Sequence, residues 1–148
     1  MSDTAAHKGD DPHPPAGFEP LANATEVERF NGPFFIRKDE VGAVIGFRAQ
    51  ERHMNAAGTC HGGVLSVFAD MQGYALAVGN FSGAAPTITL GIDFLAPVRF
   101  GDWVEATPEV TRDTKSLTFF QGMMRVEGAP VARSNGIYKK RPTGQTTR

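Results

Sequence analysis

Residues 55–79 read NAAGTCHGGVLSVFADMQGYALAVG, and the rest of the chain is arranged around this stretch. A glycine-rich polar turn leads directly into a helix that is almost entirely apolar. The helix contains one acid, Asp70, with no cation three or four residues away on either side. Because its flanking residues are apolar, we expect Asp70 to be at least partly buried. A buried carboxylate without a cation tends to have a raised pKa, which suits a general base or a nucleophile; the alternative is an ordinary exposed acid on a surface helix.

The helix has two faces of different character. A narrow face is small or polar and consists of Gly62, Ser66, Asp70, Gly73 and Ala77. The wider face is apolar and consists of Val64, Leu65, Val67, Phe68, Met71, Ala75, Leu76 and Val78. A helix that is apolar over so much of its circumference is buried on more than one side. We expect the wide face to pack on a sheet of the same chain and the narrow face to meet the same helix of a second copy.

The other ordered segments are predicted to be mostly strands. β-Branched and aromatic residues favour a hairpin of residues 34–38 and 41–49. Alternation and turn signals predict four more strands, joined by short connections as an antiparallel meander, at 87–95, 103–112, 116–126 and 131–139. Residues 18–30 have the spacing of a short helix, capped by Asn23 or Thr25 and ended by Asn31-Gly32-Pro33. The predicted class is α+β with the hotdog fold, in which a curved antiparallel sheet of about six strands wraps one long central helix.

Composition limits the classes of protein that remain. With 148 residues and 41% apolar residues, the chain is sized for one domain. We place that domain at 18–140, between a disordered tail at 1–17 and a flexible tail at 141–148. A net charge of −1 argues against binding nucleic acid through the overall field. The single cysteine, Cys60, excludes an internal disulfide, and we expect no secretory signal, no membrane span and a cytoplasmic location.

The Gly62-Gly63 pair is a candidate oxyanion site, because it opens the helix. Free backbone N–H groups and the positive end of the helix dipole stabilise a developing negative charge there. His61 either holds this turn or helps to bind a carbonyl, and Asn55 either positions a water or carbonyl or caps the turn. The hydroxyl of Thr87 could orient a water, although threonine is common in strands.

The spacing of Gly62 and Asp70 restricts how they can cooperate. Eight residues along one helix correspond to about 12 Å of rise, so the two cannot act on one carbonyl from the same chain. If both are catalytic, Gly62 of one copy must meet Asp70 of the other, with two sites per dimer.

Other chemistries fit the sequence less well. A nucleophilic Cys60 beside His61 is disfavoured, because adjacent side chains diverge. The set His53, Cys60 and His61 matches no usual zinc spacing, and the glycine turn lacks the lysine of a phosphate-binding loop. We therefore expect no metal site.

Asn55, His61-Gly62-Gly63, Asp70, the segment TITLGIDFLAP at 87–97 and Gly101-Asp102 together resemble one family. They resemble the hotdog-fold acyl-CoA thioesterases of the PaaI-like, phenylacetic-acid-degradation type, from about residue 33 to 139. The resemblance implies hydrolysis of an acyl-CoA thioester, with Gly62 N–H polarising the carbonyl and His61 and Asn55 supporting the loop. It implies that the partner subunit's Asp70 acts as general base or nucleophile and that Thr87 lies near the water. It also implies a homodimer that pairs into a homotetramer, and no metal or organic cofactor, since coenzyme A is part of the substrate.

Several residues are candidates for substrate contacts. Gly63 could bind the carbonyl with Gly62, and the basic candidates for the CoA phosphates include Arg99, Lys115 and Arg133. Met54, Tyr74 and Phe81 could line an apolar acyl pocket or simply belong to the core. Two alternatives stay open: a hotdog enoyl-CoA hydratase or dehydratase, and a non-catalytic protein that binds acyl-CoA.

Overall fold

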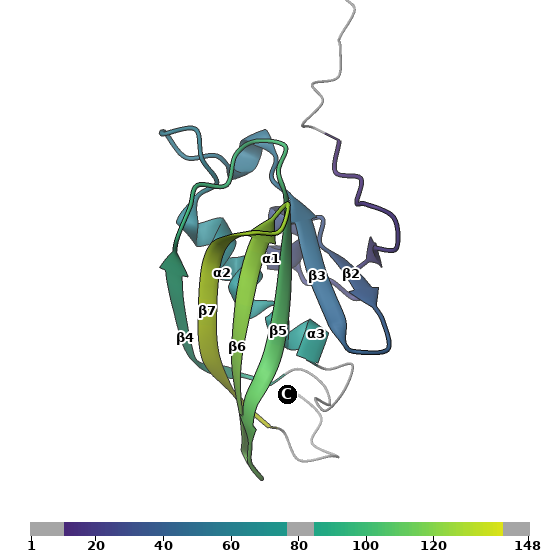
Figure 1. Cartoon of the computed structure of the whole chain (residues 1–148), viewed down its shortest axis with the longest axis vertical. Helices are drawn as coiled ribbons and strands as arrows, with labels where there is room; N and C mark the ends of the chain where they lie inside the picture. The colour runs from purple at the N-terminus through teal and green to yellow at the C-terminus, as the bar shows by residue number, and fades with distance from the viewer. Residues whose placement is uncertain (1–10, 77–84, 141–148) are drawn as a thin grey trace, which may run out of the picture.

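The computed structural model describes residues 11–76 and 85–140. One seven-stranded sheet carries the helices on one face, and all its neighbouring strands are antiparallel in the order β1-β2-β3-β5-β6-β7-β4 (Figure 1). The strands are β1 (Glu19–Pro20), β2 (Phe35–Lys38), β3 (Ala43–Arg48), β4 (Thr87–Phe94), β5 (Trp103–Asp113), β6 (Leu117–Val126) and β7 (Ala129–Lys139). The helices are α1 (Glu26–Asn31), α2 (Gly62–Asp70) and α3 (Gln72–Leu76), with a 3₁₀ turn η1 (Glu51–His53). The predicted α+β hotdog fold is confirmed, with one more strand than expected because the two-residue β1 adds to the edge.

The place of β4 differs from the expected meander. β4 pairs with β7 at one edge, whereas β5 pairs with β3 and β6. The connection between β4 and β5, residues 95–102, is long enough to cross from one side of the sheet to the other. The N–H groups of Leu95 and Ala96 donate to the Val131 carbonyl at 2.9 and 3.1 Å, and Cys60 N–H donates to Val98 at 2.7 Å. The crossing connection is therefore attached to the glycine-rich turn, so it helps to build that region.

The expected single long helix is interrupted at Met71, between α2 and α3. The Tyr138 hydroxyl accepts from Gly73 N–H at 3.1 Å and donates to the Asp70 carbonyl at 2.6 Å. Gln72 Nε2 donates to the Ala69 carbonyl at 3.0 Å. Side chains have thus replaced part of the helical hydrogen-bond ladder, which is a known cause of a bend. Residues 77–79 of the predicted helix lie outside the described residues.

The core lies between the wide face of the helices and the sheet, as predicted. Phe47 and Phe68 are fully buried, with ring centroids 4.8 Å apart in an edge-to-face arrangement. Phe34 stacks on Phe68 with centroids 5.8 Å apart. Burial of each such ring contributes about 1.5–3 kcal/mol, so α2 is held in one orientation against β3 and against Phe34, the residue before β2.

The predicted hairpin is confirmed as β2 and β3, but the helix expected at 18–30 begins later. Glu19 pairs with Ile36 in β1 and β2, and Asn23 has a φ of 57°, so the chain cannot be helical there. Thr25 is the N-cap of α1, and its N–H donates to the Glu28 side chain at 2.6 Å in a capping box.

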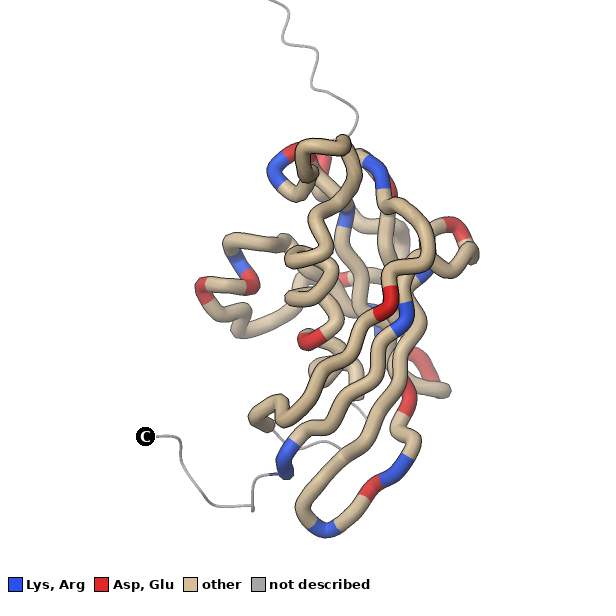
Figure 2. Tube along the Cα trace, turned by 90° about the vertical axis from the view of Figure 1, so that its left-hand side faces the viewer, with Lys and Arg blue, Asp and Glu red and all other residues tan. Residues whose placement is uncertain are grey.

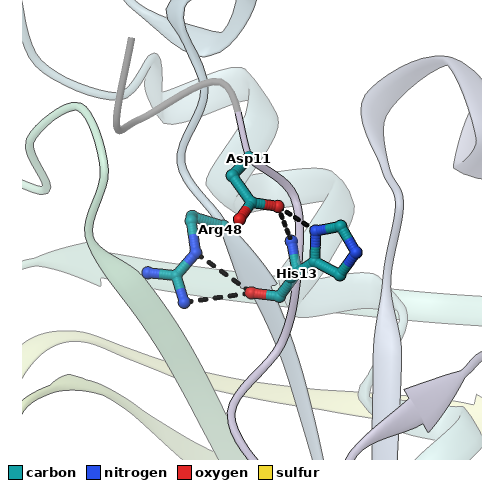
Figure 3. Close-up of polar contacts among 3 residues, drawn as sticks. All are labelled: Asp11, His13 and Arg48. Atoms are coloured by element: carbon teal, nitrogen blue, oxygen red, sulfur yellow. Dashed lines mark hydrogen bonds and ion pairs between the residues drawn. The ribbon is translucent and has the colours of Figure 1, made fainter. Parts of the chain in front are cut away.

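Residues 11–17, part of the stretch expected to be a disordered tail, run against β3 (Figure 3). Arg48 Nε and Nη2 donate to the His13 carbonyl at 3.2 and 3.1 Å, and its Nη1 donates to the Gly101 carbonyl at 3.0 Å. Asp11 accepts from the His13 N–H at 3.0 Å and also contacts the His13 ring. The described part of this segment is therefore fixed by one arginine of β3.

Charges of both signs are interspersed along the described chain (Figure 2). Within residues 11–76 and 85–140, no helix combines the length and hydropathy that crossing a membrane requires.

Candidate active site

The glycine-rich turn is built by Asn55. Its Oδ1 accepts from the N–H groups of Ala57 and Thr59 at 2.9 and 3.2 Å, and its Nδ2 donates to Thr59 Oγ1 at 3.1 Å. Gly58 completes the turn with a φ of 74°, a conformation that side-chain-bearing residues rarely adopt. Of the two roles considered for Asn55, the capping of this turn is the one visible here.

The start of α2 leaves one donor available. His61 is the N-cap, and its Nδ1 accepts from Gly63 N–H at 2.8 Å. The N–H groups of Val64 and Leu65 donate to the His61 carbonyl at 2.9 and 3.2 Å. No described residue accepts a hydrogen bond from Gly62 N–H. Gly62 is thus the free donor at the positive end of α2, while Gly63 N–H is already bonded to His61.

A surface pocket of about 390 Å³ adjoins Gly62. It is lined by Asn55, Thr59, Cys60, Gly62, Leu65 and residues 94–98. The Phe94 ring covers Gly62 so closely that an added Cβ would lie 3.1 Å from its Cζ. Glycine at position 62 therefore allows an aromatic ring and the free N–H to share one wall of the pocket.

Asp70, the last residue of α2, is exposed in the single chain, so the expectation of burial is wrong for one subunit. Successive residues of a helix point about 100° apart, and apolar neighbours at 69 and 71 can therefore face the sheet while Asp70 does not. Thr87 Oγ1 donates to Asp70 Oδ1 at 2.5 Å. The structure thus brings two of the predicted site residues together.

Thr87 reaches Asp70 because of an irregularity in β4. Leu90 packs against the core, so strict alternation would turn Thr87 and Thr89 away from the helices. The register shifts between these threonines, and Thr87 pairs with Tyr138 while Thr89 pairs with Ile137. The bulge therefore turns Thr87 to the same face of the sheet as the buried Tyr138, a common use of bulges near functional sites.

Gly62 and Asp70 are the first and last residues of α2. They are separated by about 12 Å along the helix axis, as the spacing predicted. One chain therefore places the free N–H and the carboxylate at opposite ends of the same helix.

The two apolar candidates that the structure describes, Met54 and Tyr74, are only partly exposed. Met54 is half-buried, forms a bridge with Cys60 and packs against the core. The Tyr74 hydroxyl donates to Glu28 Oε1 at 2.8 Å, and burial, assisted by Glu28, raises the pKa of Tyr74 to about 12. Phe81 lies outside the described residues.

The basic candidates lie in three different places. Arg99 is beside the turn, where its backbone bridges Thr59. Arg133 Nε is paired with Asp93 Oδ2 at 2.6 Å, and Lys115 is in the turn that follows β5. Arg99 and Lys115 are at opposite ends of the 11-residue β5, which spans about 35 Å, so one chain cannot use both on the same phosphates.

Two other chemistries find little support in the geometry. Burial raises the pKa of Cys60 to about 12, which leaves its thiol protonated and unreactive at neutral pH. The described part of the chain contains no group of three or more His, Cys, Asp or Glu side chains arranged to hold a metal ion.

Comparison with known proteins is consistent with this geometry. The family model of the thioesterase superfamily matches residues 57–132. A Pseudomonas aeruginosa protein named "Putative esterase PA0474" is 35% identical over 84% of this chain and 95% of its own length. Human acyl-coenzyme A thioesterase 13 is 27% identical over 67% of this chain and 72% of its own length. The structure of the E. coli PaaI protein from the phenylacetic acid degradation operon has a TM-score of 0.70 and 26% identity, and the match covers 80% of this chain and 86% of that one.

Proposed function

Because the chain belongs to the thioesterase superfamily, we propose that it hydrolyses an acyl-CoA thioester to a free acid and coenzyme A. The observation that carries this proposal is the Gly62 N–H, which opens α2, lines a pocket and has no acceptor among the described residues. The name of the human relative, an acyl-coenzyme A thioesterase, supports the choice of substrate class.

Gly62 stabilises the oxyanion in this mechanism. When a nucleophile adds to the thioester carbonyl, negative charge develops on its oxygen, and a backbone N–H at a helix start is already oriented to receive it. The His61 ring holds the neighbouring Gly63 N–H at 2.8 Å, which fixes the first turn of α2. Asn55 does not contact the oxyanion in this mechanism; its side chain holds the turn that leads into α2.

The partner subunit's Asp70 supplies the second half of the site. Asp70 and Gly62 of one chain lie at opposite ends of α2, so an antiparallel pair of α2 helices would bring each Gly62 to the other chain's carboxylate. As general base, the carboxylate takes a proton from water while the water oxygen bonds to the carbonyl carbon. The carbon–sulfur bond then breaks and coenzyme A leaves as the thiolate. As nucleophile, the carboxylate would instead bond to the carbonyl carbon, the carbon–sulfur bond would break with release of coenzyme A as the thiolate, and water would hydrolyse the resulting anhydride to the free acid and the carboxylate.

Exposed apolar side chains support a second copy at this face. Ile88, Phe94 and Leu95, on β4 and just beyond it, are 51%, 56% and 51% exposed in the single chain. β4 is the edge strand beside α2, so a homodimer through α2 and β4 would cover these residues. We extend the proposal to a homotetramer made of two such dimers.

Thiol release from a panel of acyl-CoAs tests the proposal. Wild type should cleave at least one aryl, short-chain or medium-chain substrate, and Asp70→Asn should lower kcat by about 10²–10⁴-fold. Asp39→Asn is the matched control, because Asp39 only accepts turn N–H groups between β2 and β3. Cleavage of no substrate by wild type, or an Asp70→Asn rate close to that of wild type, would refute the mechanism.

Complementation tests the shared site. Gly62→Val chains and Asp70→Asn chains should each be impaired, but mixed dimers recover one intact site and therefore some activity. If chain exchange is confirmed and the mixture stays inactive, the intersubunit assignment is wrong.

A further inference from the structure

The helix carrying Asp70 ends in an unusual way. In an unbroken helix, the Asp70 carbonyl would accept from Tyr74 N–H, four residues later. Here Tyr74 N–H donates to the Met71 carbonyl at 3.0 Å instead. The Asp70 carbonyl receives the Tyr138 hydroxyl at 2.6 Å, and the same hydroxyl accepts from Gly73 N–H at 3.1 Å. One phenol oxygen therefore spans the break between α2 and α3.

Tyr138 is itself held rigidly. Its side chain is buried, and its ring stacks on Phe120 with centroids 4.8 Å apart and planes 10° apart. Burial, together with the nearby charge of Asp70, raises the pKa of Tyr138, so the phenol stays protonated and remains a donor at any working pH. The hydroxyl is thus a fixed support rather than a mobile acid.

A second contact acts on the same aspartate from the adjacent strand. Thr87 pairs with Tyr138 across β4 and β7, which lie side by side at the edge of the sheet (Figure 1). Thr87 Oγ1 donates to the Asp70 carboxylate, while Tyr138 donates to the Asp70 backbone carbonyl. One cross-strand pair therefore holds both the side chain and the main chain of Asp70.

We propose that Tyr138 is a positioning residue that fixes the main chain of Asp70 so that its carboxylate points out of α2 toward the reaction centre. The inference rests on the proposed function, because it concerns how that function's carboxylate is aimed. Tyr138 does not touch the substrate. It acts through the main chain of Asp70, while the hydrogen bond from Thr87 restricts rotation of the Asp70 carboxylate.

Tyr138→Phe removes the hydroxyl and keeps the stacked ring. Because a catalytic group displaced by about 1 Å can cost up to 10²-fold in rate, kcat should fall by about 10- to 100-fold while KM changes by less than about twofold. In an Asp70→Asn background the same substitution should have no further effect, since no carboxylate is left to position. Thr118→Val is the matched control: Thr118 is the register partner of Tyr138 on β6 and loses a hydroxyl bonded to Asp113, so kcat should stay unchanged.

The outcomes are distinguishable. If Tyr138→Phe lowers kcat equally in both backgrounds, its role is only structural and the proposal is overturned. An unchanged kcat in the wild-type background also overturns it. If Asp70→Asn alone keeps the wild-type rate, the proposed function fails, and this is seen without any Tyr138 variant.

If Tyr138→Phe does not fold, Gly73→Ala provides a second test of the positioning role of Tyr138. An added Cβ at position 73 would lie 3.3 Å from Tyr138 Cζ and 3.4 Å from its hydroxyl oxygen, so the phenol must shift by a few tenths of an ångström, while alanine favours the helix. A folded Gly73→Ala protein with lowered kcat supports the proposal, and one with wild-type kcat overturns it.

Discussion

Gly122→Ala is predicted to displace Gln72, whose side chain is bonded at the break between α2 and α3. An added Cβ on Gly122 of β6 would lie 1.7 Å from Gln72 Oε1 and 2.8 Å from its Cδ. Gln72 is fully buried, and its Nε2 donates to the Ala69 carbonyl at 3.0 Å and to Ser134 Oγ at 2.6 Å. A rotation of the amide that moves Oε1 away from Gly122 would also move Nε2 away from these two acceptors.

The magnitude follows from these distances. To reach the 3.4 Å at which ordinary contact begins, Oε1 must move by about 1.7 Å. Overpacking of this kind costs about 1–3 kcal/mol, and each buried polar group left without its bond costs about 1–3 kcal/mol more. We expect Gly122→Ala to lower the free energy of unfolding by about 2–6 kcal/mol.

Urea unfolding at one fixed protein concentration measures this change. Gly42→Ala is the control, because a Cβ at position 42 meets nothing within 4 Å, and it should change the free energy of unfolding by less than about 1 kcal/mol.

Gln72→Ala removes the obstructing amide, so the double variant should be more stable than the sum of the single changes predicts, by about 2–3 kcal/mol. Additivity within about 0.5 kcal/mol, or a loss below about 1 kcal/mol for Gly122→Ala alone, would refute the packing argument.

Two further predictions concern titratable groups. Because burial raises the pKa of Cys60 to about 12, the native protein should resist iodoacetamide at pH 8 and be labelled fully after denaturation; rapid labelling of the native protein would contradict the burial. Burial, reinforced by Arg52, lowers the pKa of His53 below 6.5, and His53 Nδ1 accepts from Gln50 N–H at 2.9 Å. As the pH drops, His53 therefore takes up a proton in the unfolded chain before it does so in the folded chain. The contribution of His53 to the free energy of unfolding should be fully present above about pH 6.5 and be lost progressively below it. His53→Gln should flatten the change in urea midpoint between pH 7 and pH 5, and an equally steep change in this variant would contradict the assignment.

Local patterns predicted the individual elements well. The alternation of residues 116–126 matches β6, and the apolar spacing after Gly62 matches α2. Of the two roles considered for His61, the structure shows the one that holds the turn, because its ring accepts from Gly63 N–H. Each of these patterns can be read within a short stretch of the sequence.

Other features depend on residues far apart in the chain. The place of β4 beside β7 follows from a crossing connection that a meander model excludes. The break at Met71 follows from the side chains of Gln72 and Tyr138, and neither glycine nor proline marks residue 71 itself. Asp70 is exposed in the single chain, contrary to the prediction, because the apolar residues beside it in the sequence point in other directions on the helix.

The contact between Asp70 and Thr87 was only partly predictable. A hydroxyl was expected near the site at position 87, but the alternation of β4 alone would have pointed it away from α2. The bulge between Thr87 and Thr89 reverses that direction, and no local turn signal announces it. Tyr138, which donates to the backbone carbonyl of Asp70, is not among the residues predicted for the site.

The late pairing of β4 has a consequence for biosynthesis. β4 leaves the ribosome directly after the helices, but its only strand partner in the described sheet is β7, which comes after the other described strands in the chain. Until β7 emerges, the nascent chain holds β4 without a neighbour, and such long-range pairing forms slowly. The cross-strand pair of Thr87 and Tyr138 can form only once β7 has been synthesised, so a ribosome-bound fragment that ends before Tyr138 has the turn before Gly62 but lacks the Tyr138 contact to Asp70. The Asp70 carbonyl therefore gains its hydrogen bond from Tyr138 only after β7 has been made.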